Sequence, residues 1–119
     1  MEQGKTFLLR QGDVLLVRVA EIPEVPTAVV SVREGDRHVL AEGEATGHAH
    51  VVAGPGLRLA EWRRTRRWGA PPEQRRFLVV EGEATLSHQE HLPLTVPAGV
   101  YEVRRQREYR PERSVWVAD

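Results

Sequence analysis

Short valine-rich runs, broken by glycine and proline, dominate the pattern of hydrophobic and polar positions along the chain. Such runs favour β-strands, because β-branched side chains pack well on a pleated, half-buried surface. No segment combines helix caps with an apolar stripe at the helical period. At 119 residues the chain has room for one core. We therefore predict an all-β fold, a small β-barrel or β-sandwich, in a single domain over residues 1–119.

Turn signals divide the chain into short expected strands. These strands cover residues 6–10, 13–20, 28–32, 37–42, 45–53, 57–62, 77–81, 84–88, 92–96, 100–105 and 114–117. Residues 11–12 are expected to form a turn or bulge, and residues 54–56 another turn. Residues 63–76 have no consistent period and contain a Pro-Pro step, so we expect a long loop there.

One segment of the chain occurs twice. Residues 38–46 recur as residues 77–85, and the pentapeptide Glu-Gly-Glu-Ala-Thr is identical in both copies. Each copy predicts a hairpin with its turn at Gly43 or Gly82, because glycine reaches positive φ without steric cost. Two such hairpins packed face to face would give a pseudo-two-fold arrangement. The simpler alternative is two hairpins that share turn chemistry in unrelated surroundings.

Each copy of the repeat is followed by a pair of histidines. His48 and His50 lie two residues apart, so on a strand both side chains point to the same face. His88 and His91 would share a side only at a strand end or bulge. If the two hairpins pack together, the pairs meet and offer imidazole ligands to a divalent metal such as Zn, Fe, Ni or Mn. The nearby carboxylates that would complete the shell are Glu44, Glu83, Glu90 and Glu102. The alternative is four histidines at strand edges that bond to the backbone.

The order of these motifs resembles that of the cupin family, whose members are small β-barrels. His48-Ala49-His50 is similar to the His-x-His of that family, and residues 77–84 and 96–99 are similar to its later Glu-Gly-Glu-Ala and Pro-x-Gly segments. The resemblance covers residues 43–103, and Glu102 stands where the family carries a histidine. It implies a jelly-roll barrel that holds a metal through histidines and a carboxylate. With the second histidine pair, the candidate metal ligands are His48, His50, His88, His91 and Glu102.

Two arginine-rich segments suggest a different function. Residues 58–76 contain seven arginines against two glutamates, and residues 104–113 contain five against two. Guanidinium groups bind phosphate through paired hydrogen bonds, and both arginine and tryptophan stack on unpaired bases. A surface for nucleic acid or a protein partner would use Trp62, Arg63, Arg64, Arg66, Arg67, Trp68, Arg104, Arg105 and Arg107. The alternative is a set of solvated charges that protect sheet edges from aggregation.

Charge and composition narrow these hypotheses. The 17 basic and 17 acidic residues give zero net charge, which argues against a general nucleic-acid coat. The absence of cysteine excludes disulfides and thiolate metal sites. No signal-peptide core and no apolar stretch of about 20 residues is present, so we expect a cytoplasmic protein without membrane contact. No nucleophile elbow or phosphate-binding glycine loop stands out.

Two hypotheses follow. In the first, the domain binds a divalent metal through its histidines. An open metal position would serve the binding or turnover of a small molecule, whereas four protein ligands would make the site structural. In the second, the domain is a non-enzymatic module whose Trp- and Arg-rich segments contact nucleic acid or a protein partner, or build a homo-oligomer.

Overall fold

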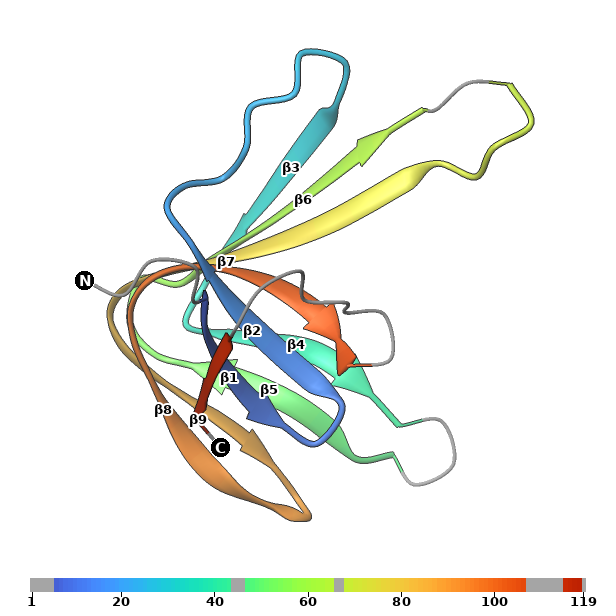
Figure 1. The fold of residues 1–119 in the computed structure, drawn as a ribbon. Helices are drawn as coiled ribbons and strands as arrows, with labels where there is room; N and C mark the ends of the chain where they lie inside the picture. Colours follow the sequence, from blue (N-terminus) through green and yellow to red (C-terminus); the bar gives the residue numbers. More distant parts are fainter. Residues whose placement is uncertain (1–5, 44–46, 66–67, 107–114, 119) are drawn as a thin grey trace.

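The computed structural model describes residues 6–43, 47–65, 68–106 and 115–118 (Figure 1). Within these ranges the chain forms nine β-strands and no α-helix, so the predicted all-β fold is confirmed. The strands are β1 (Thr6–Gln11), β2 (Val14–Val19), β3 (Val29–Glu34), β4 (Arg37–Glu42), β5 (Ala49–Ala53), β6 (Arg58–Arg64), β7 (Glu73–His88), β8 (His91–Arg105) and β9 (Val115–Ala118). None of the described segments is a helix long and apolar enough to span a membrane.

All of these strands belong to one sheet, in which β7 is the central element. The order is β3-β6-β7-β8-β2-β1-β9, with β5 also paired to β7 and β4 paired to β5. The pairs are antiparallel except for β1 with β9. The beginning of β7 pairs with β6, and its end pairs with β5. Between Val80 and Glu83 the register of β7 against β8 shifts, and such an irregularity bends a strand.

The bend allows the sheet to fold over a common core. Leu9 and Leu16 from β1 and β2 share this core with Leu40 and Val52 from β4 and β5. The two parts of the sheet therefore face each other, as Figure 1 shows. Each fully buried aliphatic side chain contributes about 1.5–3 kcal/mol to folding. A second, smaller cluster consists of Ala60, Trp62 and Phe77, with Val19, Ile22, Val25 and Ala28 packed against it.

The expected long loop over residues 63–76 is shorter in the structure. Strand β6 continues to Arg64 and β7 already begins at Glu73, so that paired strands extend outward as an arm (Figure 1). Backbone pairing, with Arg64 opposite Glu73, overrides the irregular hydrophobic pattern of this segment. The polar sequence therefore marks exposed strands as well as a loop.

The expected hairpin at the second copy of the repeat is wrong. Residues 77–88 belong to the single strand β7, and Gly82 does not take a positive φ. Residues 92–105 likewise form one strand, β8. The first copy does lie at a hairpin, between β4 and β5, where Gly43 N–H donates to the carbonyl of His48 at 2.8 Å; residues 44–46 lie outside the described residues. The same pentapeptide is extended in the second copy because β8 pairs with it at Glu83, Ala84 and Thr85.

Candidate functional site

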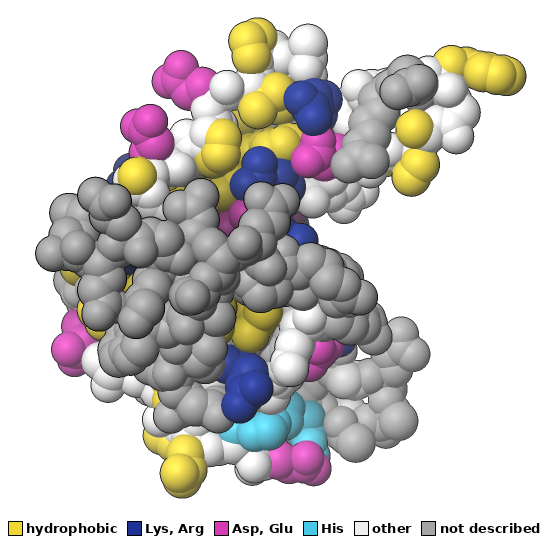
Figure 2. Space-filling view, in the orientation of Figure 1, with side chains coloured by type: hydrophobic (Ala, Val, Ile, Leu, Met, Phe, Trp, Pro, Cys, Tyr) yellow, Lys and Arg dark blue, Asp and Glu magenta, His cyan; other side chains and the backbone are white. Residues whose placement is uncertain are grey.

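The two histidine pairs meet because the segments that follow the two copies of the repeat are hydrogen-bonded neighbours. Strand β5 pairs with the end of β7, where Val51 lies opposite Ser87. His88, the last residue of β7, pairs with His91, the first residue of β8. His50 lies on β5 and His48 lies just before it. The histidine side chains consequently gather in one patch at the lower end of the molecule in Figure 2.

Three of the rings form a triangle. The ring centroids of His50 and His88 are 4.2 Å apart, those of His88 and His91 are 4.8 Å apart, and those of His50 and His91 are 5.9 Å apart. His48 lies at the edge of the triangle, with its centroid 5.6 Å from that of His88. The structure thus brings together all four histidines that the sequence singled out. His50 is the buried member of the group.

Gln11 fixes the tautomer of His50. The Gln11 side chain is 2% exposed, and its Nε2 donates to the carbonyls of Leu86 and Leu92, both at 3.0 Å. Both amide hydrogens are therefore in use, and Oε1 can only accept. It lies 3.0 Å from Nδ1 of His50, so His50 carries its proton on Nδ1. In the neutral ring, Nε2 is then the nitrogen with the available lone pair.

Gly12 lets the turn between β1 and β2 approach the rings closely. Its φ is +58°, a value that favours glycine. A Cβ at this position would lie 2.8 Å from Nε2 of His91 and 3.3 Å from Cε1 of His50. The edges of these two rings therefore face the same point, directly above the Gly12 backbone.

Glu90, in the turn between β7 and β8, contacts the other two histidines. Its backbone N–H donates to Nδ1 of His88 at 3.0 Å, so neutral His88 carries its proton on Nε2. Its carboxylate lies 3.2 Å from Nδ1 of His48. His50 and His88 are consequently held in opposite tautomers.

The environment keeps His50 neutral. Burial lowers the pKa of His50 from 6.5 to about 4, and the nearby charges of His88, His91 and Arg105 act in the same direction, whereas Asp13 opposes them. The pKa of His88 is also lowered, by burial and then by His91 and His48, with Glu90 acting against the shift. Neutral imidazole is the form that binds a metal.

The fit of this group to a metal ion is partial. Two imidazoles that share one tetrahedral metal have ring centroids about 5 Å apart, since each metal–nitrogen bond is about 2.0–2.1 Å. The three centroid distances bracket this value. In the described part of the chain, however, no three side chains are already placed to hold a metal ion. His88 must first release the Glu90 N–H and turn its ring.

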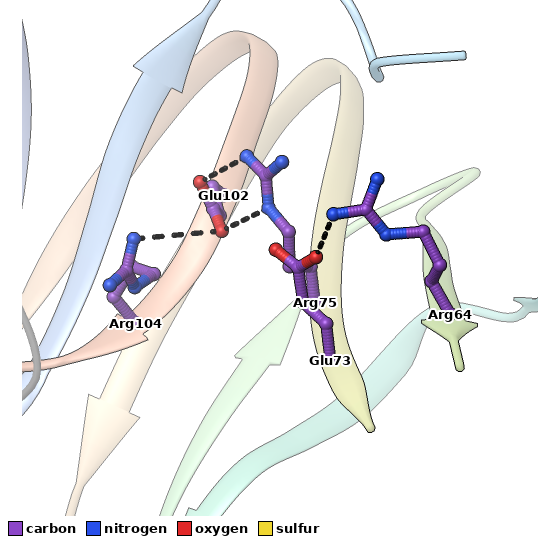
Figure 3. A network of polar contacts seen from close by, with 5 residues as sticks. All are labelled: Arg64, Glu73, Arg75, Glu102 and Arg104. Atoms are coloured by element: carbon purple, nitrogen blue, oxygen red, sulfur yellow. Dashed lines mark hydrogen bonds and ion pairs between the residues drawn. The ribbon is translucent and has the colours of Figure 1, made fainter. Parts of the chain in front are cut away.

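Glu102, the fifth candidate ligand, has a different role. It is 6% exposed, and its two carboxylate oxygens accept hydrogen bonds from Nε and Nη2 of Arg75, both at 2.9 Å (Figure 3). Arg104 lies 3.8 Å from the same carboxylate. Within the described structure Glu102 makes no hydrogen bond or ion pair with a histidine. The expectation that Glu102 binds a metal beside the histidines is therefore corrected, because a buried carboxylate committed to a guanidinium is not available.

The two arginine-rich segments also meet, around a cavity of about 750 Å³ between β6, β7 and β8. The charged residues that line the cavity are Glu61, Arg63, Glu73, Arg75, Arg76, Glu102, Arg104 and Arg105. Nearby carboxylates neutralise several of the arginines: Glu73 pairs with Arg64, and Asp13 pairs with Arg105. The arginines thus line a cavity of mixed charge.

The residues expected to bind nucleic acid are not equivalent in the structure. Trp62 is 1% exposed and stacks on Phe77 at a centroid distance of 6.3 Å, so it is not accessible to a base. Trp68, by contrast, is 99% exposed on the segment that joins β6 to β7. Arg66, Arg67 and Arg107 lie outside the described residues.

Gln11 and Arg75 are site residues that sequence reasoning missed. Gln11 looked like part of a turn, and its partner His50 follows 39 residues later. Arg75 looked like one charge among many in an expected loop. The available signal for Gln11 was its position between two apolar runs that were expected to be strands. A polar residue that is buried at such a position needs a hydrogen-bond partner.

Fold and site together define a small all-β domain with a group of histidines held against a buried glutamine. The sequence profile of a family described as a domain of unknown function (DUF8820) matches residues 10–106, and the chain belongs to this family. No curated protein and no solved structure matches the chain. The resemblance to cupins stays a prediction.

Proposed function

We propose that this domain binds a divalent transition metal between His50, His88 and His91. The observation that carries the proposal is the hydrogen bond between Gln11 and His50. Metal-binding histidines commonly donate their second N–H to a fixed acceptor, which orients the ring and sets its tautomer. Gln11 supplies such an acceptor to a buried, neutral imidazole and leaves Nε2 to bind the metal.

The chemistry of the donors suits zinc, nickel or iron. Three neutral imidazoles leave one coordination position for water or a small carboxylate. His50 is the anchoring ligand. His88 is half-buried and His91 is exposed, so both rings can turn at the hairpin end without repacking the core.

Titration of the metal-free protein with Zn²⁺ near neutral pH, by calorimetry and by elemental analysis of the dialysed complex, tests this proposal. We expect about one ion per chain, by analogy with mononuclear histidine sites. His50→Ala should weaken binding by more than about 100-fold, since loss of a mere supporting group already costs about 10–100-fold.

His38→Ala is the matched control. His38 is the remaining histidine, is also buried, and contacts the Gly35 carbonyl at 3.1 Å rather than the other rings. The His38→Ala variant should bind Zn²⁺ with unchanged affinity. Absence of saturable binding in the unmodified protein, or equal losses in the two variants, would contradict the proposal.

A further inference from the structure

Arg75 is held rigidly from two sides at the wall of the cavity between β6, β7 and β8. On one side, Nε and Nη2 donate to the two oxygens of Glu102. On the other, its guanidinium carbon lies 5.1 Å from the ring centroid of Trp62 and 5.0 Å from that of Phe77. Paired hydrogen bonds to a carboxylate and stacking on aromatic rings both restrict a guanidinium to one orientation. The pKa of Arg75 is raised, first by its hydrogen bond to Glu102, so its charge is permanent.

The remaining terminal nitrogen of Arg75 is unused. In Figure 3 it points away from Glu102, and Nη1 has no hydrogen-bond partner among the described residues. A guanidinium has five N–H donors, and the pair with Glu102 uses two of them. The free donors on Nη1 and Nη2 have the spacing that a second carboxylate or a phosphate group accepts.

The surroundings of Arg75 also favour an anion. Five arginines line the cavity, against three glutamates in the same lining and Asp13, which pairs with Arg105, so the arginines still outnumber the carboxylates. Trp62, another lining residue, has a buried Nε1–H without a hydrogen-bond partner in the described structure. The volume of about 750 Å³ lies within the range of about 300–1,000 Å³ that small-molecule sites occupy.

We propose that this cavity binds a small anionic molecule through a carboxylate or phosphate group on Arg75. Glu102 is the positioning residue that presents the guanidinium. A small anion fits better than a nucleic acid, because Trp62 in the cavity wall is too buried to stack on a base. The proposal does not depend on metal binding by the histidines.

The test is a titration of the metal-free, full-length protein with inorganic phosphate and, separately, with succinate. The readout is the Nε–H resonance of Arg75 in protein labelled with ¹⁵N at arginine, with Arg58 as the internal reference. Arg58 is also ion-paired, to Glu81 at 3.1 Å, but does not line the cavity. We expect a saturable shift at Arg75 with at least one of the two anions, and none at Arg58. Whichever anion saturates at the lower concentration identifies the group that the site takes.

Two variants then locate the site. Arg75→Lys keeps the positive charge but loses the paired N–H donors of the guanidinium, so it should weaken anion binding at least about tenfold. Arg58→Lys should not change it. A single-stranded oligonucleotide is titrated in the same way. The proposal is overturned if neither small anion gives a saturable shift, if Arg58 responds as Arg75 does, or if the oligonucleotide alone shifts the Arg75 resonance. These outcomes leave metal binding by the histidines untouched, because they concern different side chains.

Discussion

At the scale of single residues, the site depends on Gln11, whose side-chain nitrogen and oxygen are both hydrogen-bonded. Gln11 spends both N–H donors on the carbonyls of Leu86 and Leu92 and its oxygen on His50. It therefore fixes three features together: the end of β7, the start of β8 and the tautomer of His50. The orientation of the Gln11 amide matters as well as its position. If the amide were rotated by about 180°, it would offer His50 a donor in place of an acceptor.

Replacement of Gln11 should affect both stability and metal affinity. We expect Gln11→Leu to destabilise the fold by about 1–3 kcal/mol, because it leaves buried polar groups unsatisfied. Zn²⁺ affinity should fall about 10–100-fold because the His50 ring is no longer oriented. Chemical denaturation and calorimetry measure the two effects. Gln74→Leu, a change at an exposed glutamine on β7, should produce neither.

Gly12 offers a test of close approach. Gly12→Ala should weaken metal binding and lower the melting temperature, because the new Cβ meets Nε2 of His91 at 2.8 Å and the backbone has positive φ. Gly69→Ala separates these causes, since Gly69 also has positive φ, +88°, but has nothing within 4 Å of an added Cβ. We expect Gly69→Ala to cost some stability and no metal affinity. Equal affinities in the two variants would show that the Gly12 backbone does not shape the site.

The pH dependence of stability follows from the lowered pKa of His50. The folded value is about 4 and the unfolded value 6.5, so between these pH values the unfolded chain binds more protons. The stability of the metal-free protein should therefore be complete above pH 6.5, fall by up to about 3 kcal/mol toward pH 4 and then level off. The lowered pKa of His88 acts in the same direction. In urea titrations across this range, His50→Leu should flatten the difference between neutral and acid pH.

At the scale of elements, β7 decides the architecture. Its first part belongs to the arm with β6, and its last part receives β5. The register shift between Val80 and Glu83 separates the two parts and allows one strand to serve both. A hairpin at Gly82 would have broken this connection.

Two glycines near the second copy of the repeat should respond oppositely to alanine. Gly82→Ala should be tolerated, because Gly82 lacks positive φ and an added Cβ has nothing within 4 Å. Gly54→Ala should be strongly destabilising, since its Cβ would lie 2.8 Å from the Glu83 carbonyl and 3.0 Å from the Ala84 Cα. Thermal unfolding of the two variants measures the difference. A large loss at Gly82 would instead support a turn at that glycine.

At the scale of the whole molecule, the histidines connect segments that are distant in sequence. His50 comes from β5, while His88 and His91 come from the hairpin of β7 and β8. Gln11, at the end of β1, connects the β1–β2 turn to the same group through its hydrogen bonds to Leu86 and His50. A metal bound there would join β5 directly to the β7–β8 hairpin and would reach β1 through the Gln11–His50 hydrogen bond, so its effect should extend beyond the site.

Metal should therefore stabilise the entire domain. At a free Zn²⁺ concentration of about 100 times the dissociation constant, we expect about 2.7 kcal/mol of added stability, visible as a single shifted unfolding transition. The His50→Ala protein in the same buffer should gain less than about 0.4 kcal/mol, because its affinity is expected to be more than about 100-fold weaker. A shift of equal size in that variant would place the bound ion elsewhere.

The sequence by itself determined the all-β fold class and most strand positions, and it singled out the four histidines as candidates. The fold class and the strand positions follow from local causes, namely valine-rich runs and turn residues. The histidines meet because β5 pairs with β7 and β7 pairs with β8. Tertiary structure decided what the repeat becomes, because pairing with β8 holds the second copy extended where the first copy turns. It also assigned Glu102 to Arg75 and Gln11 to His50. Those partners lie far apart along the chain, and only the folded sheet brings their donors and acceptors within hydrogen-bonding distance.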